Sequence, residues 1–329
     1  MQRTPSPAKI DHAASILRAG GIVAFPTETV YGLGANALDG VAVARIYAVK
    51  GRPATSPLIV HVASVAMAKS LVASWPEIAE CLAGKFWPGP LTLVLPKRHA
   101  IPDIVTAGLG TVGLRMPAHP VALALIRAAS VPLAAPSANR FTELSPTTAR
   151  HVRQSLGGDV DLILDAGPSE VGIESTVVSL VGSRPVLLRP GGISRKELES
   201  VIGPLSPAKD LEEGPHPSPG MHARHYSPRT SLLLVSDGEL PDEGHGIYLR
   251  RTNPARVRDD LRSKSDSAAF GITIIQMPTE PAKYAARLYE QLHLADDAQV
   301  DWIAVDLPPM TGEWEAIHDR LRRAAGKSG

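Results

Sequence analysis

The sequence predicts two α/β domains joined by a proline-rich segment. From about residue 8 to 205, short apolar runs typical of strands alternate with stretches whose apolar residues recur at helical spacing. The same alternation resumes after residue 231. Between the two, residues 203–229 hold six prolines and no regular pattern, which is typical of a stiff linker. The expected divisions are a first domain over 1–203, a linker over 204–230 and a C-terminal α/β domain over 231–329.

The first domain is expected to hold a mixed and largely buried sheet. A helix is predicted around residues 10–17, a strand at 22–25, a glycine-rich turn at 31–34 and a second helix capped by Asp39. Further strands are expected at 58–62, 91–95, 111–117, 131–135, 161–165, 176–180 and 186–189, and further helices from Ser64, Pro76, His119 and Ser145, which precedes a proline.

The C-terminal domain is expected to be a smaller, Rossmann-like unit with a parallel sheet. Its strands are predicted at 232–235, 247–250, 270–277 and 302–306. One helix is predicted where Tyr284, Leu288 and Leu292 fall in register, and a last one over 313–325.

Composition excludes several classes of protein. The chain has 329 residues, and 34 Lys and Arg against 33 Asp and Glu leave no charge excess that would favour nucleic acid or a membrane surface. Cys81 is alone, so no internal disulfide forms, and its helical setting predicts a buried small hydrophobe. No signal peptide is evident, and no run approaches the roughly 20 apolar residues that span a bilayer. We therefore expect a cytoplasmic protein.

Residues 20–62 gather the features on which a site is most easily built. A short apolar strand ends at Pro26, and the polar run Thr27-Glu28-Thr29, a basic turn at 50–53 and a histidine inside an apolar strand, His61, follow. Loops at strand ends are where binding sites are usually placed. The two glycines Gly32 and Gly34 lack the third glycine of a dinucleotide-binding loop, so that reading is discounted.

The order of motifs resembles the YrdC-type L-threonylcarbamoyladenylate synthase family. The matching runs are PTETVYGLG, KGRP, PLIVHV, FWPGPLTLVL, TVGLRMP, APSAN, ESTVV and LLRPGG, which cover residues 8 to about 195. The SPGMHARHYSP segment and the second domain are similar to the longer, two-domain form of that enzyme. The resemblance implies a YrdC-like first domain that joins L-threonine, bicarbonate and ATP into L-threonylcarbamoyl-AMP with release of pyrophosphate, the first step of a tRNA modification.

The chemistry implied by the resemblance brings two anions together, a threonine carbamate and the α-phosphate of ATP. The protein must therefore supply cations and positioning, so Lys50 and Arg52 are expected to act electrostatically, with no covalent nucleophile. Mg²⁺ would be held mainly by phosphate oxygens, with no metal ligand from protein side chains. The intermediate would pass to a tRNA threonylcarbamoyl transferase complex, with tRNA binding weak or transient.

Residue by residue, the family pattern assigns two sets of contacts. The threonine set is Thr29, His61, Arg115, Ala135 and Ser175. The ATP set is Lys50, Arg52, Ser56, Thr111, Ser137, Ser145, Arg189 and Tyr226. If Tyr226 reaches the nucleotide, the linker is a lid. Position 56 is often asparagine in the family, so the contact of the shorter Ser56 is bridged by water or lost.

Each assignment has an alternative in which the residue is structural. In these alternatives, His61 would be a core histidine and Arg115 would pair with an internal acid such as Glu28. Ser145 would cap a helix, and Tyr226 would pack the linker against the first domain. The histidines at 216, 222 and 225 lack the spacing of a zinc site, which favours a solvated loop. As a whole-chain alternative, the fold could serve a non-enzymatic double-stranded RNA-binding module with a concave basic surface, against which the near-zero net charge argues. A hydrogenase-maturation type of carbamoyl chemistry would need further domains that this chain lacks.

Overall fold

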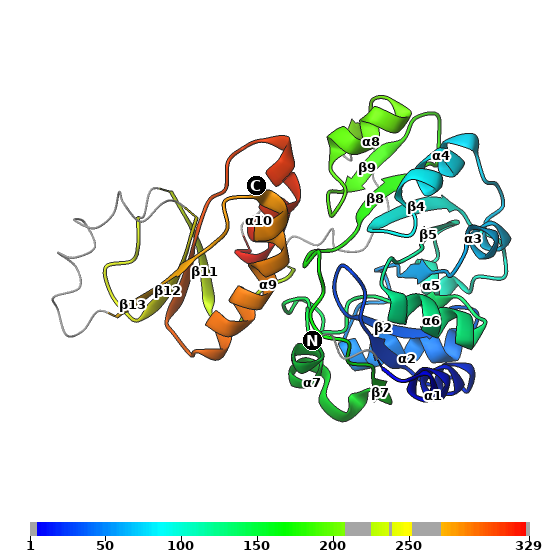
Figure 1. Cartoon of the computed structure of the whole chain (residues 1–329), viewed down its shortest axis with the longest axis horizontal. Helices are drawn as coiled ribbons and strands as arrows, with labels where there is room; N and C mark the ends of the chain where they lie inside the picture. Colours follow the sequence, from blue (N-terminus) through cyan, green and yellow to red (C-terminus); the bar gives the residue numbers. More distant parts are fainter. Residues whose placement is uncertain (1–4, 208–224, 237–238, 252–270, 327–329) are drawn as a thin grey trace. The chain divides into compact units, whose positions relative to one another are not determined.

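The computed structural model describes residues 5–207, 225–236, 239–251 and 271–326, and Figure 1 shows their helices and strands. The chain separates into two compact units, and each is described by itself. The first domain comprises Met1–Phe141 and Ser145–Met221, and the second comprises Thr142–Leu144 and His222–Gly329. Most of the expected linker, including the histidines at 216 and 222, lies outside the described residues.

The first domain is built on one mixed sheet, as expected. Its strand order in the described residues is β10-β9-β8-β4-β5-β3-β6-β2-β1-β7, with parallel and antiparallel neighbours interspersed. The strands are β1 (Val23–Phe25), β2 (Gly32–Asn36), β3 (Ile59–His61), β4 (Leu91–Pro96), β5 (Thr111–Arg115), β6 (Leu133–Ala134), β7 (Leu162–Ile163), β8 (Thr176–Ser179), β9 (Val186–Arg189) and β10 (Ser206–Pro207).

Helices bury both faces of this sheet. Alternate residues of one strand enter different cores: Val23 and Phe25 pack with helices α1 and α6, whereas Ile22 and Ala24 pack with α2 and α4 on the other side. A strand buried on both faces reads as a continuous apolar run, which is why the sequence shows no alternation here. The helices are α1 (Pro7–Arg18), α2 (Gly40–Lys50), α3 (Val65–Leu71), α4 (Glu77–Phe86), α5 (Asp103–Thr106), α6 (Pro120–Ala129), α7 (Ala149–Leu156) and α8 (Arg195–Ile202).

The glycine-rich segment expected to form a turn at 31–34 is instead the start of strand β2. The ring of Phe25 lies across the backbone there: a Cβ on Gly34 would meet its Cε1 at 2.7 Å. The glycines are therefore needed for the close approach of the neighbouring strand and not for a reversal of the chain. The turn prediction was wrong, because spacing alone does not distinguish these two uses of glycine.

Side-chain caps fix where two site-bearing helices begin. Asp39 accepts hydrogen bonds from the backbone N–H groups of Val41 and Ala42, which confirms the predicted start of α2. The start predicted at Ser145 is wrong, because α7 begins at Ala149 and is capped by Thr148.

The second domain carries a four-stranded sheet in which all neighbours are parallel, as predicted. The strand order is β11-β14-β12-β13. Tyr284, Leu288 and Leu292 lie buried along one helix, as their spacing predicted. The elements are β11 (Ser231–Val235), β12 (Gly246–Arg250), β13 (Ile272–Gln276), α9 (Pro281–Asp297), β14 (Trp302–Asp306) and α10 (Glu315–Ala324).

Cys81 is exposed, contrary to the expectation of a buried small hydrophobe. Helix α4 buries Ala79, Leu82 and Ala83, and Cys81 falls on its opposite face. In the described part of the chain, no helix has the length and apolar character needed to cross a bilayer.

Candidate active site

The loop between β1 and β2 is held in one conformation by its own hydroxyls. Thr27 Oγ1 donates to the carbonyl of Val30 at 2.6 Å and accepts from the N–H groups of Thr29 and Val30. The loop that contains Val171 also holds this segment in place, because the N–H of Val171 donates to the carbonyl of Glu28 at 2.7 Å. The side chains of this loop are therefore presented from a fixed backbone.

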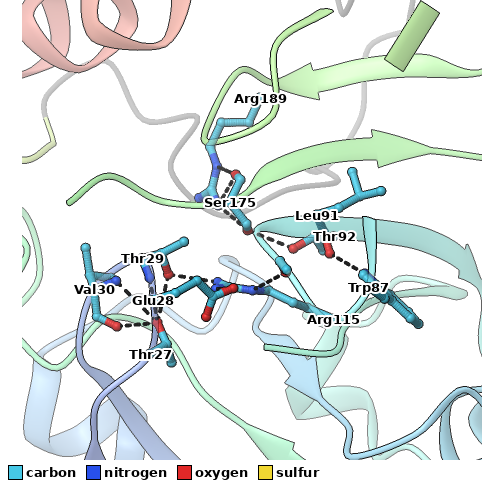
Figure 2. Close-up of polar contacts among 11 residues, drawn as sticks. Thr27, Glu28, Thr29, Val30, Trp87, Leu91, Thr92, Arg115, Ser175 and Arg189 are labelled. Carbon is cyan, nitrogen blue, oxygen red and sulfur yellow. Dashed lines mark hydrogen bonds and ion pairs between the residues drawn. The ribbon is translucent and has the colours of Figure 1, made fainter. Parts of the chain in front are cut away.

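Arg115, the last residue of β5, makes three contacts in the interior (Figure 2). Its Nη1 donates to Thr29 Oγ1 at 2.9 Å and its Nε to the carbonyl of Gly89 at 3.3 Å, while Nη2 lies 2.7 Å from a carboxylate oxygen of Glu28. Arg115 and Glu28 are both almost fully buried. The ion pair with Glu28, considered from sequence as an alternative, is thus present together with the contact to Thr29.

Two more members of the threonine set lie next to Arg115. His61 of β3 is its register partner in the parallel β3–β5 pair. The N–H of Ala135 donates to the carbonyl of Ile59, two residues before His61, so the end of β6 borders the same place. Both residues are buried. The three neighbouring strands therefore bring His61, Arg115 and Ala135 together.

Ser175 connects the threonine set to the ATP set. Its Oγ is 2.8 Å from Thr92 Oγ1, and Arg189 Nη2 donates to its carbonyl at 2.9 Å and to its Oγ at 3.2 Å. Figure 2 shows Arg189 and Thr92 on either side of this serine. Gly191 permits the close approach of the two segments, because a Cβ there would lie 2.4 Å from the carbonyl oxygen of Glu174. Arg189 is consequently held against Ser175, the residue that precedes β8.

Lys50 ends α2 and lies beside the loop that contains Ser137. Its Nζ donates to the carbonyl of Ser137 at 2.6 Å and also to the carbonyl of Asn139. The side chain is 2% exposed, so this ammonium group is largely removed from water. The same loop donates from Ala138 N–H to the carbonyl of Tyr31, which places Lys50 and Ser137 next to the β1–β2 segment.

Arg52 and Ser56 belong to the turn after α2. Arg52 is buried and donates to the carbonyls of Ser56 and Pro57, with its guanidinium 5.8 Å from the ring centre of Phe141. Pro57 and Thr111 line a small cavity of about 10 Å³, together with Ile59, Thr92, Gly113 and Val177. Thr111 and the turn that carries Ser56 are therefore brought to one place.

Ser145 has a use other than helix capping. Its Oγ donates to Glu174 Oε1 at 2.6 Å, and both residues are buried. Glu174 directly precedes Ser175, so this bond holds Ser145 close to a member of the threonine set. The neighbouring Pro146 accepts from Tyr31 N–H at 2.8 Å, and the chain is held extended before α7 begins.

Two buried polar atoms around Arg115, Glu28 Oε2 and His61 Nδ1, have no hydrogen-bond partner among the described residues, whereas Glu28 Oε1 and Arg115 Nη2 form an ion pair with each other at 2.7 Å. Burial lowers the pKa of His61 to about 3, with a smaller contribution from the positive charge of Arg115, so the imidazole is neutral at pH 7. Unpaired buried polar groups are costly in a folded protein, and their gathering at one point indicates a ligand site.

The pKa of His61 predicts a specific loss of stability in acid. An unfolded histidine titrates near pH 6.5. Between about pH 6.5 and 3, His61 is therefore protonated in the unfolded chain but not in the folded one. The stability is fully present above this window and falls as the pH decreases, by about 2 kcal/mol at pH 5 from this group. Urea unfolding of wild type and His61→Asn at pH 7 and pH 5 measures the difference. Equal losses in both proteins would contradict it.

Tyr226 is the one predicted site residue outside the first domain. It lies in the second domain, 1% exposed, with its ring 5.9 Å from that of Tyr289 and 5.1 Å from the guanidinium of Arg320. Its φ of 60° is a left-handed value that tyrosine seldom adopts. The observed packing is against α9 and α10 of its own domain.

Four residues that hold the site were not assigned to it from sequence: Thr27, Glu28, Thr92 and Glu174. Each lies inside one of the family motifs. Thr27 bonds within its own loop, whereas Glu28, Thr92 and Glu174 act through partners distant in sequence. A threonine on a strand and a glutamate in a loop carry no local sign of that partner. Groups of three histidine, cysteine or acidic side chains suited to a metal ion are absent from the described ranges.

Fold and site together define an α/β protein that holds buried cations and hydroxyls at strand ends, an arrangement suited to anionic ligands. Residues 15–191 match a family model described as telomere recombination, and residues 193–326 match one described as threonylcarbamoyl-AMP synthase, C-terminal domain.

Full-length relatives carry the same two parts. The threonylcarbamoyl-AMP synthase of Bacillus subtilis is 45% identical over 324 residues, covering 97% of this chain and 93% of the relative. That of Pyrococcus abyssi is 42% identical over 332 residues, covering 97% and 94%. The crystal structure of Pyrococcus abyssi Sua5 complexed with L-threonine matches with a TM-score of 0.85 at 38% identity, covering 98% of this chain and 96% of that one.

The chain therefore belongs to the threonylcarbamoyl-AMP synthase family. The expected enzyme class, a nucleotidyltransferase, is confirmed, as are the YrdC-like first domain and the α/β second domain. The RNA-binding alternative is set aside because matched relatives over nearly the full length are enzymes.

Proposed function

We propose that the first domain binds L-threonine at Arg115 and ATP at Lys50, Arg52 and Arg189, and joins them through bicarbonate into L-threonylcarbamoyl-AMP. The observation that carries the proposal is the buried Arg115 bonded to Thr29, with Glu28 Oε2 and His61 Nδ1 nearby and without hydrogen-bond partners among the described residues. A guanidinium can pair both oxygens of the threonine carboxylate. The L-threonine complex of the Pyrococcus abyssi relative supports the same amino acid here.

The roles proposed for the other residues of the threonine set follow from where they lie around Arg115. Neutral His61 and the hydroxyls of Thr29 and Ser175 offer hydrogen bonds to the threonine side chain without adding charge. Ala135 borders the same place through its backbone.

On the ATP side, Arg189 is tied to Ser175, so a phosphate held by it lies next to the amino acid. Thr111, Ser137 and Ser145 supply short donors around Lys50 and Arg52, and the contact of Ser56 is bridged by water or lost. Tyr226 is assigned to ATP on the family resemblance alone.

The reaction needs no covalent attachment to the protein. The α-ammonium group of threonine first loses a proton to water, and the free amine attacks the carbon of bicarbonate with loss of water, which gives a carbamate. A carbamate oxygen then attacks the α-phosphorus of ATP, and pyrophosphate leaves. Both partners are anionic, so the side chains contribute by lowering their repulsion and aligning them. ATP enters as its magnesium complex, with the ion on the phosphate oxygens. The product is a reactive mixed anhydride, which favours transfer to a tRNA threonylcarbamoyl transferase complex with little tRNA bound here.

Pyrophosphate release with each substrate withheld in turn tests this function. We expect release only when ATP, L-threonine and bicarbonate are all present, because the carbamate that attacks ATP forms from the other two. L-serine and L-valine are informative controls, since each lacks one of the two β-substituents of threonine. Release that persists without threonine would contradict the proposed reaction.

A further inference from the structure

The five residues predicted to bind threonine include a cation but no anion. Threonine enters as a zwitterion, so its ammonium group would lie near the guanidinium of Arg115 without a compensating charge. A buried cation is costly unless an anion is close. The positive charge of the substrate therefore calls for an acid in the immediate surroundings of Arg115.

Glu28 is the acid that meets this requirement. A carboxylate oxygen lies 2.7 Å from Arg115 Nη2, and only 7% of the Glu28 side chain is exposed. Oε1 is the oxygen paired with Arg115, and Oε2 has no hydrogen-bond partner among the described residues. The other acid at the site, Glu174, already receives the hydroxyl of Ser145. Glu28 thus has the free acceptor capacity that an ammonium group needs.

The main chain around Glu28 fixes where that carboxylate points. Its carbonyl accepts from Val171 N–H at 2.7 Å, and the next carbonyl, of Thr29, accepts from Gly172 N–H at 3.1 Å. Thr29 in turn receives Arg115 Nη1, so cation and anion are positioned by the same three-residue loop. A site pre-organised in this way loses little entropy when it binds.

We propose that Glu28 receives the α-ammonium group of L-threonine and forms, with Arg115, a buried charge pair matched to the amino-acid zwitterion. This assignment rests on the proposed function. In the free enzyme Glu28 compensates the guanidinium; in the complex the carboxylate of threonine shares Arg115, and its ammonium group shares Glu28. The pair would select α-amino acids against hydroxy acids of the same shape, because a neutral hydroxyl cannot replace the charge.

Calorimetric titration with two ligands separates this role from a structural one. The ligands are L-threonine and 3-hydroxybutanoate, which keeps the carboxylate and hydroxyl but lacks the ammonium group. For Glu28→Gln we expect the Kd of threonine to rise about 10- to 100-fold. The Kd of 3-hydroxybutanoate, measured by competition, should stay within about threefold or fall, since Arg115 then has no competing anion. Glu77→Gln, at an exposed acid of the same domain, serves as the matched control.

Each outcome bears on one proposal. Equal weakening of both ligands would show that Glu28 only holds Arg115, and unchanged threonine affinity would show that it does not meet the substrate; either overturns the inference. Failure of the wild type to bind threonine would overturn the proposed function instead. If Glu28→Gln does not fold, Glu28→Asp keeps the charge but withdraws it by one methylene, and the same separation between the two ligands is expected.

Discussion

Replacing Arg115 by alanine is expected to lower the free energy of unfolding by about 3–5 kcal/mol. The substitution leaves the carboxylate of Glu28 buried without its counterion, and it removes the bonds to Thr29 and to the Gly89 carbonyl. The KM for threonine should rise more than the KM for ATP, because Arg115 bonds to Thr29 of the threonine set. Urea unfolding and steady-state kinetics measure the two effects.

Two comparisons make the Arg115 prediction specific. The double variant Glu28→Gln/Arg115→Ala should recover part of the lost stability, since no buried charge is then unpaired. Arg140→Ala removes an arginine of the same domain from a half-exposed pair with Asp159 and should cost no more than about 1 kcal/mol. If the double variant is less stable than Arg115→Ala, the charge pair is not what the single substitution disrupts. If threonine and ATP requirements change equally, the role of Arg115 is structural.

Lys50→Met is expected to lower kcat for pyrophosphate release by about 10²–10³, because one positive charge next to the reacting phosphate is lost. The ammonium group is almost fully buried against the carbonyls of Ser137 and Asn139, where its field is weakly screened. Binding of threonine should change by less than about threefold, since the described hydrogen bonds of Lys50 go to the loop with Ser137 and Asn139.

The matched control for Lys50 is Lys85→Met, at an exposed lysine in the last turn of α4. It removes the same side chain from the same domain and should leave kcat unchanged. A Lys50→Met enzyme with near wild-type turnover would show that the cation is structural. A loss of threonine affinity as large as the loss of turnover would show that Lys50 supports the whole loop from Ser137 to Asn139 and not the phosphate alone.

Much of the fold could be predicted from local sequence. The strand and helix alternation, the Asp39 cap and the parallel second sheet depend on nearby residues, and these predictions were confirmed. The errors arose where the conformation of a residue depends on a partner from another segment of the chain. Gly34 accommodates the ring of Phe25 in a strand, and Ser145 bonds to Glu174 rather than capping a helix.

The membership of the site stays a prediction from the family motifs. Among the residues that they name, the structure joins Thr29 to Arg115 and Ser175 to Arg189 through hydrogen bonds. No sequence rule identified the orientation of Glu28, because an acid in a polar loop usually faces water. Its burial follows from the packing of the loop at residues 171–172 over it, a contact between segments more than a hundred residues apart.

The identity of the nucleotide product tests the central claim most directly. The protein is incubated with ATP, L-threonine and ¹³C-labelled bicarbonate. The products are then separated, and their masses are determined by mass spectrometry. We predict an AMP conjugate that contains one threonine and one labelled carbon, formed in equal amount to pyrophosphate. An AMP product without the labelled carbon, such as a plain threonyl adenylate, or pyrophosphate release without any conjugate, would contradict the account.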